Sequence, residues 1–77
     1  MSSLTKDRSA LADAFLESYL CWREACEDVS TAYRAWSASN RQQRGVGFST
    51  YRAALDREEC AARVYSHWAE RLAARVR

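Results

Sequence analysis

Residues that interrupt helices are confined to one short stretch of this 77-residue chain. Proline is absent, and the only two glycines are Gly45 and Gly47. An all-β domain needs many turn residues, and this chain does not have them. Hydrophobic residues make up 48% of the chain and aromatic residues 12%, a composition that disordered chains do not have. We therefore predict a single all-α domain over residues 1–77.

Two runs of apolar residues at helical spacing flank the glycines. The first run steps by three or four residues from Leu11 to Trp36, and the second does so from Phe48 to Val76. Spacing of this kind over several heptads is typical of amphipathic helices in coiled coils and bundles. Two helices of similar length joined by a short connection favour an antiparallel helical hairpin.

The boundaries of the predicted elements follow from these runs. We expect a short polar N-terminal tail, a first helix, a connecting turn and a second helix, over roughly residues 1–4, 5–40, 41–48 and 49–76. The first helix ends near Asn40, or it continues to Arg44 with Gly45 as a left-handed C-cap. Ser49 or Thr50 then caps the second helix.

The apolar runs also supply the candidate interaction residues. We predict that they form a seam within the hairpin and between hairpins, made of Phe15, Tyr19, Trp22, Cys26, Val29, Tyr33, Trp36, Tyr51, Leu55, Ala62, Tyr65, Trp68 and Leu72. Glu58 is the one charged residue within the second run. It is either a partner-specifying charge answered by Arg34 or the Tyr33 hydroxyl, or a residue at the edge of the run that reaches water.

A single hairpin has more apolar side chains than it can cover. Leu16, Leu20, Val64 and Trp68 lie beside the two runs, and exposed tryptophans would form an unusually large apolar patch. Residues 1–40 carry six acids and four bases, whereas residues 41–77 carry four acids and eight bases. Halves of opposite sign favour pairing of helices. We therefore expect a homodimer that forms a four-helix bundle.

Catalytic and metal-binding patterns are absent from the sequence. The soft metal ligands are Cys21, Cys26, Cys60 and His67. Cys21 and Cys26 diverge around the helix, and Cys60 and His67 share an outer face but lie two turns apart, too far to bind one zinc ion. The sole histidine falls on the predicted outer face, so a Cys–His catalytic pair is not expected. We predict no enzyme activity, no metal site and no cofactor.

Nucleic-acid and membrane binding are not favoured either. The basic clusters are Arg41 with Arg44 in the turn, and Arg71, Arg75 and Arg77 near the C-terminus. A hairpin puts these clusters at opposite ends, away from aromatic residues that could stack on bases. The polar faces carry both signs of charge, and no apolar run is long enough to span a bilayer.

These observations predict a small non-enzymatic helical hairpin that acts as a protein–protein interaction or adaptor module. Two alternatives remain open: an obligate subunit that docks on a different protein, or a small nucleic-acid-associated regulator that uses the turn and C-terminal arginines. Eleven of the twelve basic residues are arginine, which indicates a GC-rich, bacterial genome. Three cysteines without an apolar leader segment indicate the cytoplasm.

Overall fold

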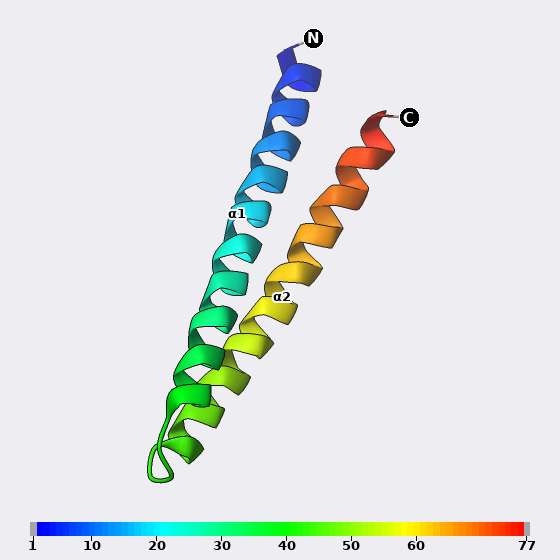
Figure 1. The fold of residues 1–77 in the computed structure, drawn as a ribbon. Coiled ribbons are helices and arrows are strands. Elements are labelled where there is room, and N and C mark those ends of the chain that lie inside the picture. The colour runs from blue at the N-terminus through cyan, green and yellow to red at the C-terminus, as the bar shows by residue number, and fades with distance from the viewer. Residues whose placement is uncertain (1, 77) are drawn as a thin grey trace.

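The computed structural model is a hairpin of two long helices, α1 (Ser2–Ala38) and α2 (Arg44–Val76). The structure describes the backbone of residues 2–76 and the side chains of residues 9–75. The helices run antiparallel and pack against each other, so that both chain ends lie at one end and the connection at the other (Figure 1). The described backbone contains no strand, and the predicted all-α helical hairpin is confirmed.

The element boundaries differ from the predicted ones. Residues 2–4, predicted as a polar tail, belong to α1, while Met1 lies outside the described residues. Helix α1 ends at Ala38, and α2 begins at Arg44 rather than near residue 49. The connection is therefore residues 39–43, shorter and earlier in the chain than the predicted turn at 41–48.

Asn40 stabilises the turn that leads into α2. Its side-chain Oδ1 and its backbone carbonyl both accept a hydrogen bond from the Gln43 amide, at 3.0 and 3.1 Å. Asparagine side chains commonly bind nearby backbone amides in this way in turns. Ser49 and Thr50, the predicted caps, lie within α2 instead, where the Thr50 hydroxyl donates to the Val46 carbonyl at 3.0 Å.

Both glycines lie in the first turn of α2, and neither has a positive φ. The predicted left-handed cap at Gly45 is therefore wrong. Gly47 serves a different purpose, because a Cβ atom there would lie 3.3 Å from Cδ1 and 3.4 Å from Cα of Trp36. The missing side chain lets α2 pass close to α1 immediately after the connection.

Small side chains occupy the centre of the helix–helix contact. The buried positions of α1 recur every seven residues, at Leu11, Ser18, Ala25 and Ala32. The most buried residue of α2 is Ala54, which is 1% exposed. The Ser18 hydroxyl donates to the Phe15 carbonyl at 2.7 Å, so this buried polar group is satisfied. Because no large side chain among the described residues is fully buried, the hairpin lacks a conventional core.

The result is a rod rather than a globule. Its principal extents are 62 × 16 × 13 Å and its radius of gyration is 17.5 Å. A compact domain of this length has a radius of gyration of about 11.5 Å. Two helices side by side are one layer thick, and this shape leaves most side chains within reach of solvent.

Candidate protein interaction surface

Aromatic side chains line one side of the helix–helix contact in two clusters. We call the first the distal cluster, formed by Phe15, Tyr19, Trp22 and Tyr65. We call the second the turn cluster, formed by Tyr33, Trp36, Phe48 and Tyr51. Each cluster takes residues from both helices. Phe48 belongs to the turn cluster although it was not among the predicted seam residues.

Tyr65 holds the distal cluster together. Its ring stacks on that of Trp22 with centroids 5.4 Å apart and an interplanar angle of 2°. It also contacts Phe15 at 5.4 Å and Tyr19 at 5.7 Å. Aromatic pairs at these separations stabilise a protein by about 0.5–1.5 kcal/mol beyond the burial of their area. One side chain of α2 therefore fixes three rings of α1.

Trp36 and Tyr51 have the same role in the turn cluster. Their rings stack with centroids 5.4 Å apart and an angle of 14°. Trp36 also contacts Phe48 at 5.4 Å, and Tyr51 contacts Tyr33 at 5.5 Å. This cluster adjoins Gly47, whose lack of a side chain makes room for the Trp36 ring.

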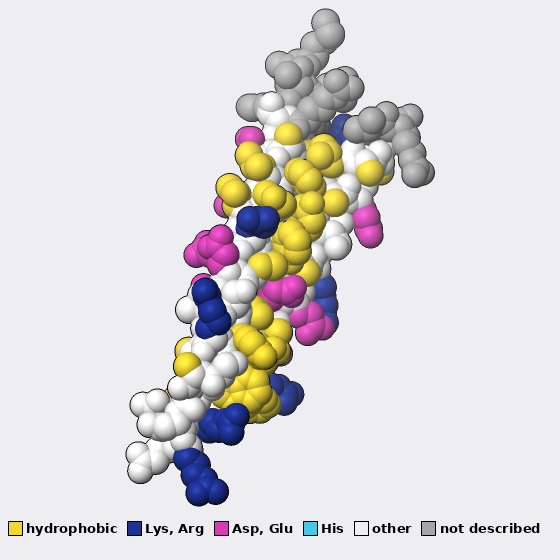
Figure 2. All heavy atoms as spheres, viewed as in Figure 1, with side chains coloured by type: hydrophobic (Ala, Val, Ile, Leu, Met, Phe, Trp, Pro, Cys, Tyr) yellow, Lys and Arg dark blue, Asp and Glu magenta, His cyan; other side chains and the backbone are white. Residues whose placement is uncertain are grey.

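The two clusters, with the positions that share their side of each helix, make up a surface that we call the open face. By helical spacing from the clustered rings, these further positions are Cys26, Val29, Leu55, Glu58, Ala62 and Leu72. Figure 2 shows hydrophobic side chains following this face along both helices, interrupted by acidic groups near its middle. Tyr33 is 50% exposed, Phe48 44% and Leu55 39%. The open face is thus ordered by contacts within the hairpin but is not covered by it.

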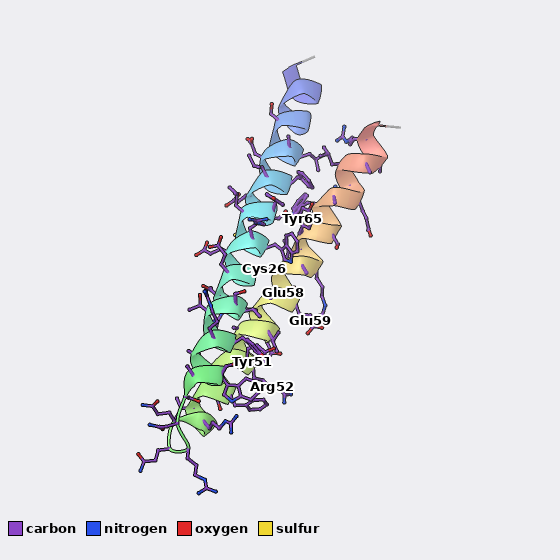
Figure 3. The ribbon with its side chains drawn as sticks, viewed as in Figure 1. Cys26, Tyr51, Arg52, Glu58, Glu59 and Tyr65 are labelled. Atoms are coloured by element: carbon purple, nitrogen blue, oxygen red, sulfur yellow. The ribbon has the colours of Figure 1, made fainter. Side chains whose placement is uncertain are left out.

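Glu58 lies at the middle of the open face. It is half-buried, and Figure 3 shows it level with Cys26, between Tyr51 and Tyr65. No hydrogen bond or ion pair joins Glu58 to another side chain among residues 9–75, so the structure shows neither of the expected partners, Arg34 and the Tyr33 hydroxyl. The neighbouring Glu59 differs, because it is exposed and accepts from the Arg63 guanidinium at 2.7 Å.

Trp22 carries a polar atom without a partner. Its indole Nε1 is buried and has no acceptor among the described residues. A buried donor without an acceptor costs about 1–3 kcal/mol. The Trp22 ring remains in place because its stacking on Tyr65 and its apolar contacts outweigh this cost.

Trp68 is a predicted seam residue that lies apart from both aromatic clusters. It lines a groove of about 390 Å³ on the opposite side of the hairpin, together with Ala14, Cys21, Ala61 and Val64. His67 meets the Trp68 ring edge-on at 5.0 Å, and the Arg71 guanidinium lies 5.8 Å from its centroid. Trp68 therefore has its own partners and does not contribute to the open face.

The described residues hold no group of three or more potential metal ligands among Cys, His, Asp and Glu. All three cysteines are free thiols, with Cys21 and Cys60 exposed and Cys26 half-buried. No stretch of either helix, within the described residues, is long and apolar enough to cross a lipid bilayer. The densest set of ring contacts among the described residues lies on the open face.

Comparison of the chain with family models, with curated proteins and with solved structures finds no significant match.

Proposed function

We propose that the protein is a non-enzymatic helical hairpin that acts as a protein–protein interaction module and associates with a second copy of itself. The observation that carries the proposal is the open face, on which two pre-formed aromatic clusters remain accessible. A surface of this kind is typical of protein interfaces, in which aromatic residues are enriched and rigid.

The solvent-accessible area of the hairpin supports an interface with a second copy of the chain. The chain exposes 6261 Å². A compact monomer of 8.8 kDa exposes about 4,800 Å², so the hairpin exposes roughly 1,500 Å² more than a globular protein of its mass. If each of two chains covers that excess, the interface buries about 3,000 Å² in total, within the range of obligate homodimers.

Charge also supports a second copy. The acidic half of the sequence forms α1, whereas the basic half forms the connection and α2. When two hairpins pack with their open faces together, α1 of each can lie over α2 of the other. Each helix then has neighbours of opposite net charge, in a four-helix bundle with antiparallel neighbours.

We also propose that the protein resides in a reducing compartment such as the cytoplasm. Free thiols at the exposed positions Cys21 and Cys60 suit such a compartment, because an oxidising one would favour disulfides between chains.

A pair of matched charge substitutions tests the proposal. Tyr33 and Leu20 are both on α1 and are 50% and 57% exposed, but only Tyr33 lies on the open face. We expect the parent protein to sediment with twice the chain mass of 8.8 kDa. Tyr33→Glu should shift it to single-chain mass because the new charge would be buried in the interface, whereas Leu20→Glu should leave the dimer intact.

Circular dichroism of each variant confirms that the helices persist. A parent protein of single-chain mass at every concentration would contradict self-association. An equal effect of the two substitutions would contradict the assignment of the open face.

A further inference from the structure

We infer that Glu58 sets the strength of this self-association, because pairing of two open faces brings two Glu58 carboxylates into one layer of the interface. The inference rests on the proposed function. Glu58 is the one charged side chain of the open face, and it lies on α2 between the two aromatic clusters. Contacts within a single hairpin do not explain its role there.

The position of Glu58 on α2 follows from helix geometry. It lies seven residues from both Tyr51 and Tyr65, so all three side chains share one side of the helix. Seven residues correspond to two turns, or about 10.5 Å along the axis, on either side. The carboxylate is therefore placed between two stacked ring systems, near the middle of the open face (Figure 3).

Two-fold symmetry fixes where the second carboxylate lies. When α1 of each chain covers α2 of the other, the axis runs along the hairpin, and every residue lies at the same height as its copy. The alternative two-fold axis runs across the hairpin and turns the copy end over end. That arrangement would place α1 of each chain over α1 of the other, so it lacks the opposite net charges that favour α1 over α2.

The chemistry of that layer is unfavourable to two negative charges. Glu58 has no ion-pair partner among the described residues. The residues three and four positions away on α2, which share its side of the helix, are all apolar: Ala54, Leu55, Ala61 and Ala62. Covering the face removes water from both carboxylates and places like charges in a region of low dielectric constant. Glu58 therefore limits the affinity of an otherwise apolar interface.

The experiment compares two adjacent carboxylates in the full-length chain. Sedimentation equilibrium gives the dimer dissociation constant of the parent, Glu58→Gln, Glu58→Leu and Glu59→Gln. We expect Glu58→Gln to lower it about tenfold and Glu58→Leu to lower it further, because an apolar replacement of a buried charge is often stabilising. Glu59→Gln should stay within about twofold, because its exposed pair with Arg63 is weak.

The outcomes separate the two proposals. A dimer whose dissociation constant is unchanged, or raised, in Glu58→Gln would overturn the role of Glu58 and leave self-association standing. Monomers in the parent and in all three variants would overturn self-association itself. The glutamine variant keeps the shape of the side chain, so it distinguishes loss of charge from a disturbance of packing.

Discussion

The two long faces of the hairpin differ in how their side chains are stabilised. On the open face, large rings stack on one another across the two helices, and Tyr65 alone contacts three of them. The opposite face is a groove with small side chains along its floor, and charged residues (Glu24, Asp28 and Arg57) line it farther along. Among the described residues, rings from the two helices stack on each other only on the open face. Aromatic contacts between the helices are therefore concentrated on one side of the hairpin.

The largest expected loss of stability comes from removing the Tyr65 ring. Tyr65→Ala deletes the ring that joins α2 to three rings of α1, and we expect a loss of about 3–5 kcal/mol in the free energy of unfolding. Val64→Ala is the matched control on the groove side, where the side chain is 49% exposed, and it should cost less than about 1 kcal/mol. Urea unfolding at one fixed protein concentration measures both. Similar losses of unfolding free energy in the two variants would contradict the larger stabilising role of the open face.

A smaller loss of stability is expected at Ala54, which lies in the helix–helix contact between the two faces. Ala54 is 1% exposed, and Ala54→Leu would add a branched side chain where the helices are closest. We expect a loss of about 1–3 kcal/mol from overpacking. Ala53→Leu, one residue away and exposed, should change stability by less than about 0.5 kcal/mol. Thermal unfolding of both variants provides the test, and a neutral Ala54→Leu would show that the helices are not closely packed there.

The sequence was sufficient to predict the helices and the hairpin, because no helix breaker lies outside the connection and the apolar spacing is helical throughout. It misplaced the connection because Gly45 and Gly47 resemble turn residues. The role of Gly47 is steric and depends on the closeness of Trp36 in the folded chain, whereas a Cβ atom at Gly45 would meet no neighbour. The role of Asn40 in the connection is visible only from its hydrogen bond with Gln43.

The candidate surface was predicted in part. Seven of the predicted seam residues form the two aromatic clusters: Phe15, Tyr19, Trp22, Tyr33, Trp36, Tyr51 and Tyr65. The centre of the contact also contains a small-residue series at Ser18, Ala25 and Ala32, which follows Leu11 at seven-residue spacing. That series was missed because serine and alanine add little to an apolar pattern. Its seven-residue recurrence was the available signal. Trp68 was misplaced because its position on the helix is compatible with either side of the contact.

Small-angle X-ray scattering in dilute solution is the sharpest test of self-association through the open face, since it reports mass and length together. We expect a scattering mass of twice 8.8 kDa with a maximum dimension close to the 62 Å length of one hairpin, because the second copy thickens the rod without lengthening it. A particle with the mass of one chain, or a dimer approaching twice that length, would show that the open face is not where the two copies meet.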